Sequence, residues 1–405
     1  MDCLVSSSLI TVFVRWTWLR AVLHNGWWLV TSLYLVVDAN LSAAQIVLIG
    51  AVQGIFALAC EVPAGVLADT ISRKWSLVVS QLLMGTAMLV TGLVTAFPLL
   101  LATQVLWGVS WSFASGADVA WITDELEQPE RISAVLARAA RAQLTGAATG
   151  LVGLGALAWA TQRDIAIVTA GAAMLLLGLY VALRFTEQRF APARAARWSA
   201  SWSIFRGGVA LVRRSPELRL IFLATFLING AADAGGRLAP KQLVDLGLPV
   251  AWDPIVWLTG VGVLALVVGA VVLRRVERRL DGERARHSYR VAAMIGLLGM
   301  TGVAFAPDAA SASAALVIVS GIAVPLTRII AALWVNARTT SVVRATTHSF
   351  LAQAEYLGEV TCGLAIAATA SLVSLPIALA ASAALFGLTA AVMRRPGAAV
   401  EPRAR

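Results

Sequence analysis

The chain has 405 residues, of which 59% are hydrophobic and only 13% charged, and its mean hydropathy is +0.80. Soluble domains carry about twice that share of charged residues, so the composition excludes a soluble protein and predicts a polytopic membrane protein. The net charge of +10 lies mainly in Arg-rich loops between hydrophobic blocks. That placement follows the positive-inside rule and does not indicate a nucleic-acid partner.

Twelve apolar blocks, most of them about 20 residues long, predict twelve membrane-spanning helices. The first six are expected at about 18–37, 44–68, 75–97, 98–122, 135–160 and 165–183. The other six are expected at about 220–236, 254–273, 291–305, 312–334, 345–372 and 375–393. Residues 184–219 separate the two sets, with eight Arg and no apolar run long enough to span.

This division predicts an N-terminal six-helix bundle over 1–186, a cytoplasmic linker over 187–217 and a C-terminal six-helix bundle over 218–405. A repeat of about 205 residues supports it, because Gly65 corresponds to Gly269 and Arg138 to Arg344. Related halves of this kind are common in secondary transporters. Assigning the linker to the cytoplasm puts both termini there, and leaves only Arg163 and Lys241 clearly in outer loops.

The stretch that closes the second block carries Gly65, Asp69, Arg73 and Lys74 at a characteristic spacing. This spacing resembles the signature loop between the second and third helices of the major facilitator superfamily, with Ser72 in place of the usual glycine. The preceding 61–65 (Glu-Val-Pro-Ala-Gly) resembles the helix ending of drug-exporter-like members. The resemblance extends over nearly the whole chain. It implies an all-α membrane fold with twelve helices in two pseudo-symmetric six-helix bundles.

The resemblance also implies an inner gate, in which the Arg of the signature loop pairs with an acid at the inner end of the fourth helix. The expected gate residues are Gly65, Asp69, Arg73, Lys74 and Asp124. A pair that forms in only one conformational state biases a two-state element, as a gate requires. The alternative is that the basic residues only determine topology.

No Gly-rich loop ending in Gly-Lys-Ser/Thr is present, which argues against ATP hydrolysis and leaves an ion gradient as the energy source. Proton coupling requires titratable groups within the membrane. The candidates are Glu61, Asp118, Glu355 and Glu359. For Glu61 the alternative is a structural hydrogen bond near Pro63, and for the other two Glu it is a salt bridge to Arg328 or Arg20.

Polar and aromatic residues within the spans are candidates for the lining of a substrate cavity. They are His24, Asn25, Trp28, Trp107, Trp111, Asp233, Arg237 and Arg328. The Trp residues are equally suited to anchoring at the membrane interfaces, and the Asp233–Arg237 pair to mutual neutralisation. In the fifth span, Gly146, Gly150, Gly153 and Gly155 predict close helix approach. The proline found there in the antiporters of the family is missing.

These observations predict a secondary active transporter that exports small amphipathic or aromatic compounds, such as drugs, by proton-coupled alternating access. The alternative is uptake or exchange of a metabolite, an anion or a lipid through the same fold without proton antiport. The expected partners are a small-molecule substrate, protons and membrane lipids. We expect a monomer in a bacterial inner membrane, with no cofactor, no metal and no enzymatic activity.

Overall fold

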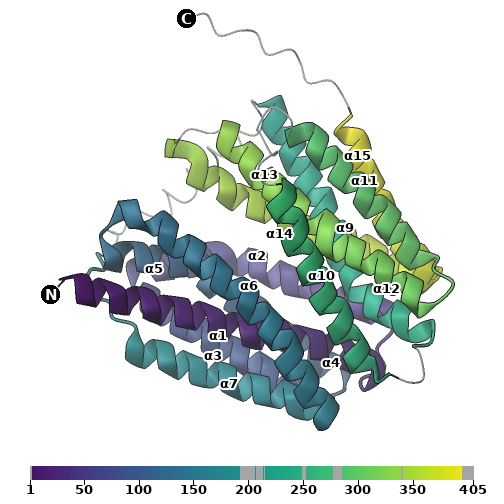
Figure 1. The fold of residues 1–405 in the computed structure, drawn as a ribbon, viewed down its shortest axis with the longest axis horizontal. Coiled ribbons are helices and arrows are strands. Elements are labelled where there is room, and N and C mark those ends of the chain that lie inside the picture. The colour runs from purple at the N-terminus through teal and green to yellow at the C-terminus, as the bar shows by residue number, and fades with distance from the viewer. Residues whose placement is uncertain are drawn as a thin grey trace, which may run out of the picture. The chain divides into compact units, whose positions relative to one another are not determined.

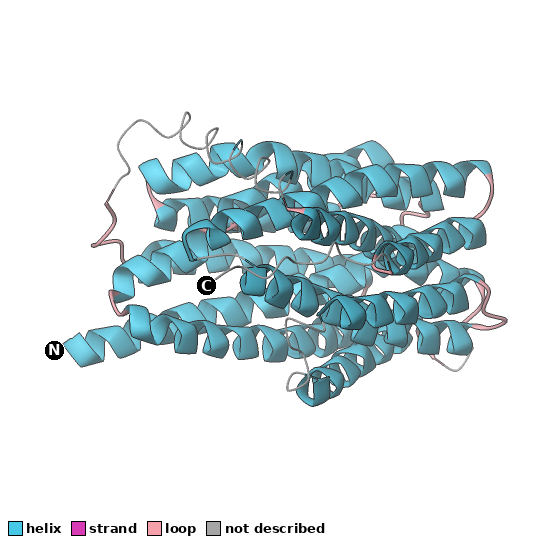
Figure 2. Cartoon of the chain, turned by 90° about the horizontal axis from the view of Figure 1, so that it is seen from above, coloured by secondary structure: helices cyan, strands magenta, loops and turns pink. Residues whose placement is uncertain are grey.

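The computed structural model describes residues 2–191, 206, 213, 215–248, 252–276, 285–338 and 341–394. All regular secondary structure within these residues is helical (Figures 1 and 2). The linker expected over 187–217 lies largely outside them.

The N-terminal elements follow one another with short connections. They are α1 (Asp2–Val37), α2 (Ala43–Thr70), α3 (Arg73–Thr91), α4 (Phe97–Ala114), α5 (Ala117–Leu126), α6 (Pro129–Ala160) and α7 (Arg163–Arg184). The C-terminal elements are α9 (Pro216–Asp245), α10 (Pro254–Val276), α11 (Ala285–Ala304), α12 (Ala309–Ile318), a π-helix (Val319–Ala323), α13 (Val324–Arg338), α14 (Ser341–Leu372) and α15 (Leu375–Val392).

The predicted twelve-helix membrane fold is confirmed, because α4 with α5 forms one span, and α12, the π-helix and α13 form another. By length and composition, eight spans in the described part of the chain are apolar enough to cross a membrane. The remaining four are formed by α1, α6, α11 and α14.

The fourth span differs from its prediction as one continuous helix. It is interrupted at Ser115 and Gly116, and Gly116 has φ of 74°. This left-handed conformation costs glycine little, whereas a side chain disfavours it. Hydrophobicity alone did not predict the break, because apolar residues continue on both sides of it.

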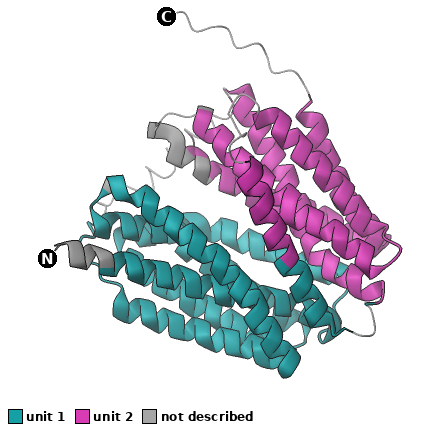
Figure 3. Ribbon diagram, in the orientation of Figure 1, with its two compact units in different colours: residues 1–198, 248–263 teal, residues 199–247, 264–405 magenta. Residues whose placement is uncertain are grey.

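Contacts divide the chain into two compact units (Figure 3). The first contains Met1–Trp198 and Leu248–Val263, and the second contains Ser199–Gly247 and Leu264–Arg405. Within the first unit, α1 packs on α6 and α7, α3 on α4 and α7, and α2 on α4. Within the second, α9 packs on α14 and α15, and α15 packs on α11.

Glycine residues allow helix backbones to approach each other closely in both units. A Cβ on Gly150 of α6 would lie 2.1 Å from the carbonyl oxygen of Val22 in α1. In the second unit, a Cβ on Gly358 of α14 would lie 2.0 Å from the carbonyl oxygen of Phe226 in α9. The same small-residue packing therefore joins the first and fifth spans of one unit and the seventh and eleventh spans of the other.

Candidate functional site

The signature loop places Arg73 at the start of α3, where its guanidinium contacts three oxygen acceptors. It forms an ion pair with the Asp124 carboxylate near the end of α5, and it donates to the carbonyl oxygen of Ala120 at 3.1 Å. A longer contact of 3.4 Å joins it to Asp69 in α2. Three of the five expected gate residues thus meet at one end of the first unit.

The other two expected gate residues lie beside this contact. The Lys74 ammonium lies 5.9 Å from the centre of the Trp75 ring. A Cβ added to Gly65 would meet no atom within 4 Å, so this arrangement does not itself require glycine there.

Glu187 is a partner of the signature loop that the sequence does not predict. Its carboxylate accepts hydrogen bonds from the Ser72 hydroxyl and from the backbone N–H groups of Arg73 at 2.7 Å and Lys74 at 3.0 Å. Ser72 is also the N-cap of α3, since its Oγ accepts from the backbone N–H of Trp75 at 2.9 Å. The backbone of Ser72 is extended, with φ of −176°, and so does not need the glycine of the family pattern.

Residues 185–190, which we call the strap, also contact α5. The Phe185 ring stacks on Trp121 with centroids 4.1 Å apart, and the Trp121 indole N–H donates to the carbonyl oxygen of Thr186 at 2.7 Å. Glu125 is only 6% exposed, and its carboxylate accepts hydrogen bonds from the backbone N–H groups of residues 188 and 189 at 2.9 Å each. The strap therefore holds the residues next to both members of the Arg73–Asp124 pair.

The break in the fourth span brings two proton-coupling candidates to one region. Ser115 donates its hydroxyl to Oε1 of Glu61 in α2 at 2.7 Å. The other carboxylate oxygen, Oε2, is buried and has no hydrogen-bond partner in the described part of the chain. Asp118 lies in the first turn of α5, where it accepts from the N–H of Val119 at 2.8 Å and interacts electrostatically with Arg20 of α1.

Several of the cavity candidates form an aromatic cluster between α1 and α4. The His24 ring lies 5.4 Å from Trp107 and 5.8 Å from Trp111, and these two indoles stack on each other at 5.4 Å. Trp28 lies 6.4 Å from Trp107. Asn25 instead donates its amide to the carbonyl oxygen of Ala21 in its own helix at 2.9 Å.

The second unit collects the remaining charged candidates. Arg237 donates its Nε to both carboxylate oxygens of Asp233, at 2.8 and 2.9 Å. This contact matches the interpretation that the pair neutralises itself. Glu359 interacts electrostatically with this pair, with Glu355 and with Arg328. Arg328 itself is exposed.

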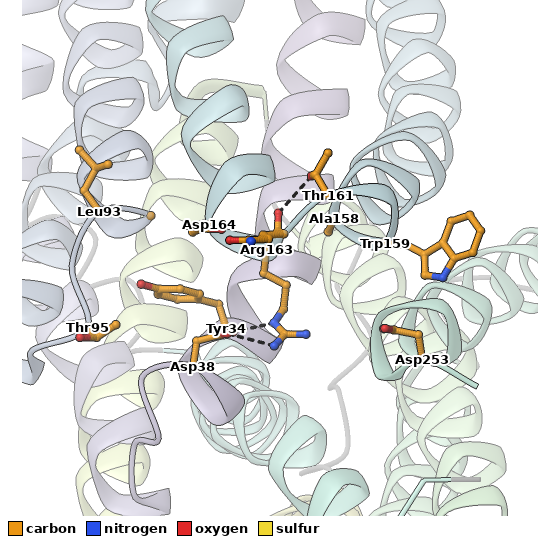
Figure 4. Close-up of a pocket in the computed structure, with 12 residues that line it drawn as sticks. Tyr34, Asp38, Leu93, Thr95, Ala158, Trp159, Thr161, Arg163, Asp164 and Asp253 are labelled. Atoms are coloured by element: carbon orange, nitrogen blue, oxygen red, sulfur yellow. Dashed lines mark hydrogen bonds and ion pairs between the residues drawn. The ribbon is translucent and has the colours of Figure 1, made fainter. Parts of the chain in front are cut away.

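A cavity of about 490 Å³ lies within the first unit, at the ends of α1, α6 and α7 (Figure 4). Arg163 points its guanidinium at Asp38 there, with N–O distances of 2.6 and 3.0 Å. Asp164, Asp253, Tyr34 and Trp159 also line it. From the sequence, Arg163 is expected only in an outer loop.

Comparison with known proteins places this geometry in a family. The model of the Major Facilitator Superfamily matches residues 8–361. Similar solved structures include a mutant of the nucleoside transporter NupG (TM-score 0.80, 11% identity, 95% of this chain and 98% of that chain covered). A bacterial homologue of the human lysosomal transporter Spinster in an inward-facing, unoccupied conformation has a TM-score of 0.72 at 14% identity, with 96% of each chain covered.

A D-xylose-proton symporter has a TM-score of 0.70 at 12% identity, with 96% of each chain covered. At these identities the likeness shows the fold alone. Among curated proteins, none matches the sequence.

Proposed function

We propose that this chain exports small amphipathic or aromatic compounds in exchange for protons. The chain belongs to the Major Facilitator Superfamily and is a secondary transporter of that type. It acts as a monomer in a bacterial inner membrane, with both termini in the cytoplasm. This orientation rests on the excess of Lys and Arg in the loops assigned to the cytoplasm.

The observation that carries proton coupling is the pair of carboxyl groups at the break of the fourth span. A buried carboxylate oxygen without a partner is costly to leave charged, and Oε2 of Glu61 is such an oxygen. A proton on this carboxyl removes that cost, while Oε1 keeps the hydrogen bond from Ser115. Asp118, by contrast, has the Arg20 charge near it. Glu61 is therefore the proposed proton carrier of the first unit.

The inner gate is proposed at the Arg73–Asp124 contact. Arg73 begins α3 and Asp124 lies near the end of α5, so a change in their separation moves the ends of two spans. Arg73 is 18% and Asp124 34% exposed at the side chain. A partly solvated pair of this kind is worth about 1 kcal/mol or less, weak enough to form and break in each transport cycle.

The test is transport into and out of proteoliposomes that contain the purified full-length protein. Efflux of planar aromatic compounds is followed with and without an imposed pH gradient, for the unchanged protein and for Glu61→Gln and Asp118→Asn. The gradient should accelerate movement in the unchanged protein, and Glu61→Gln should abolish that acceleration. Glu359→Gln tests the second unit in the same assay.

Asp308→Asn is the matched control, because Asp308 is an exposed N-cap of α12 that Asn can replace. It should retain full gradient dependence. If the rate of substrate movement in the unchanged protein does not depend on the gradient, proton coupling is wrong. If Glu61→Gln retains the gradient dependence, Glu61 is not the proton carrier.

A further inference from the structure

Aromatic residues line facing stretches of α1 and α4 inside the first unit. On α1, residues 16, 20, 24 and 28 are Trp, Arg, His and Trp at spacings of four, which puts them on one helix face. On α4, Trp107 and Trp111 have the same spacing and stack on each other at an interplanar angle of 9°. The His24 ring lies against both of these indoles.

Two buried nitrogens of this cluster have no hydrogen-bond partner in the described part of the chain. Trp107 is 8% exposed, yet its indole N–H has no partner in the described residues. The same holds for Nε2 of His24. A buried polar atom without a hydrogen bond costs about 1–3 kcal/mol, and native structures contain few of them. Two such nitrogens next to each other's rings indicate a place where a bound molecule supplies the hydrogen-bond partners.

The charges around the cluster argue against a cationic ligand. Arg20 interacts electrostatically with His24, and its guanidinium lies 5.4 Å from the Trp16 ring and 5.2 Å from the Trp111 ring. Aromatic faces that would attract a ligand cation are thus already used by a cation of the protein. Asp118 is the acid that interacts with Arg20, so the cluster does not require an anion either.

We infer that His24 and Trp107 recognise flat, uncharged aromatic compounds that carry a carbonyl or ring-nitrogen acceptor. The ring system stacks in the cluster of His24, Trp107 and Trp111, and the acceptor receives the indole N–H of Trp107 or the imidazole N–H of His24. This inference rests on the proposed function, for which it names the substrate class.

The experiment is a binding titration of the purified full-length protein with two probes of the same three-ring size. Acridone is uncharged and carries a carbonyl acceptor, whereas 10-methylacridinium is a permanent cation without one. Acridone should bind more tightly, and Trp107→Phe should weaken its binding by about 2- to 10-fold, the value of one hydrogen bond. Trp27→Phe is the matched control, because Trp27 is also a buried indole with an unpartnered N–H, but its ring lies beside Trp28 at 6.1 Å and not against His24, Trp107 or Trp111.

A second pair of variants, at His24, tests the same inference without changing the packing around Trp107. His24→Leu removes the nitrogen, whereas His24→Asn retains an N–H donor and should restore part of the affinity. Tighter binding of 10-methylacridinium, or equal losses for Trp107→Phe and Trp27→Phe, overturns the inference.

The two proposals fail separately. Selective acridone binding without gradient-driven transport overturns proton coupling but keeps the recognition site. Gradient-driven transport of the cation with no preference for acridone keeps proton coupling but overturns the recognition site.

Discussion

The carboxylate of Glu187 binds the backbone N–H of Arg73 at 2.7 Å, although the two residues are 114 positions apart. The same carboxylate accepts from Lys74 and Ser72, so it occupies the N-terminus of α3. A negative charge there interacts favourably with the helix dipole and satisfies N–H groups that have no partner within the helix. The strap thereby fixes the position from which Arg73 reaches Asp124.

Replacing Glu187 should loosen this end of α3. We expect Glu187→Ala to lower the free energy of unfolding by about 1–2 kcal/mol, as the loss of a helix cap does, and to lower the melting temperature in detergent. Glu187→Gln keeps one carbonyl acceptor and should lose less. An Ala variant that melts with the unchanged protein would show that Ser72 alone caps α3.

Breaking the Arg73–Asp124 pair should affect transport more than stability. Asp124→Asn removes the charge of a partly exposed pair, which costs about 1 kcal/mol or less, but it removes the contact that we propose as the gate. The transport rate and the melting temperature are measured on the same preparation. Asp245→Asn is the control, because it breaks another exposed ion pair, with Lys241 at 3.4 Å. Equal effects of the two variants on transport would contradict the gate.

Gly150 should not tolerate a methyl group. Gly150→Ala places a Cβ 2.1 Å from the Val22 carbonyl oxygen, so α1 and α6 must separate. Overpacking of this kind costs about 1–3 kcal/mol, and the melting temperature should fall. Gly153→Ala on the same helix is the matched control, since its Cβ would meet nothing within 4 Å, and it should be neutral or slightly stabilising.

Replacing Gly65 should affect transport and stability differently. Because a Cβ there meets no atom within 4 Å, Gly65→Ala should leave the melting temperature unchanged or raise it slightly, since alanine favours a helix more than glycine does. If the signature loop packs more closely in another state of the proposed cycle, the same variant should reduce the transport rate. Unchanged transport would remove Gly65 from the gate.

The ion pair between Arg163 and Asp38 should contribute little stability. Arg163 and Asp38 are 22% and 33% exposed at the side chain, so Asp38→Asn should cost about 1 kcal/mol or less. The cost should shrink as salt is added, because exposed charges are screened. Melting curves at low and high salt measure this. A large loss that does not depend on salt would indicate a buried structural role instead.

The sequence by itself determined the membrane class and the twelve spans, because an apolar block long enough to cross a bilayer has few alternatives to a helix. It also located the signature loop, whose residues are neighbours along the chain. The glycines of α6 were predicted to pack closely, and Gly150 does so, whereas Gly153 faces open space. Helical spacing identifies a shared face, but not which residues of that face meet a neighbour.

Only the tertiary structure decided the contacts between distant segments. Nothing in the sequence pairs Glu187 with the start of α3 or Glu125 with the strap, because groups 63 to 115 positions apart are brought together by packing of whole helices. The break at Gly116 could not be predicted from the sequence either. Hydrophobicity identifies a segment that spans the membrane, but it does not give the backbone angle of one residue. At this break Ser115 donates to Glu61, and the helix that carries Asp118 begins. The sequence named both acids as candidates, but only the structure relates them to the same break.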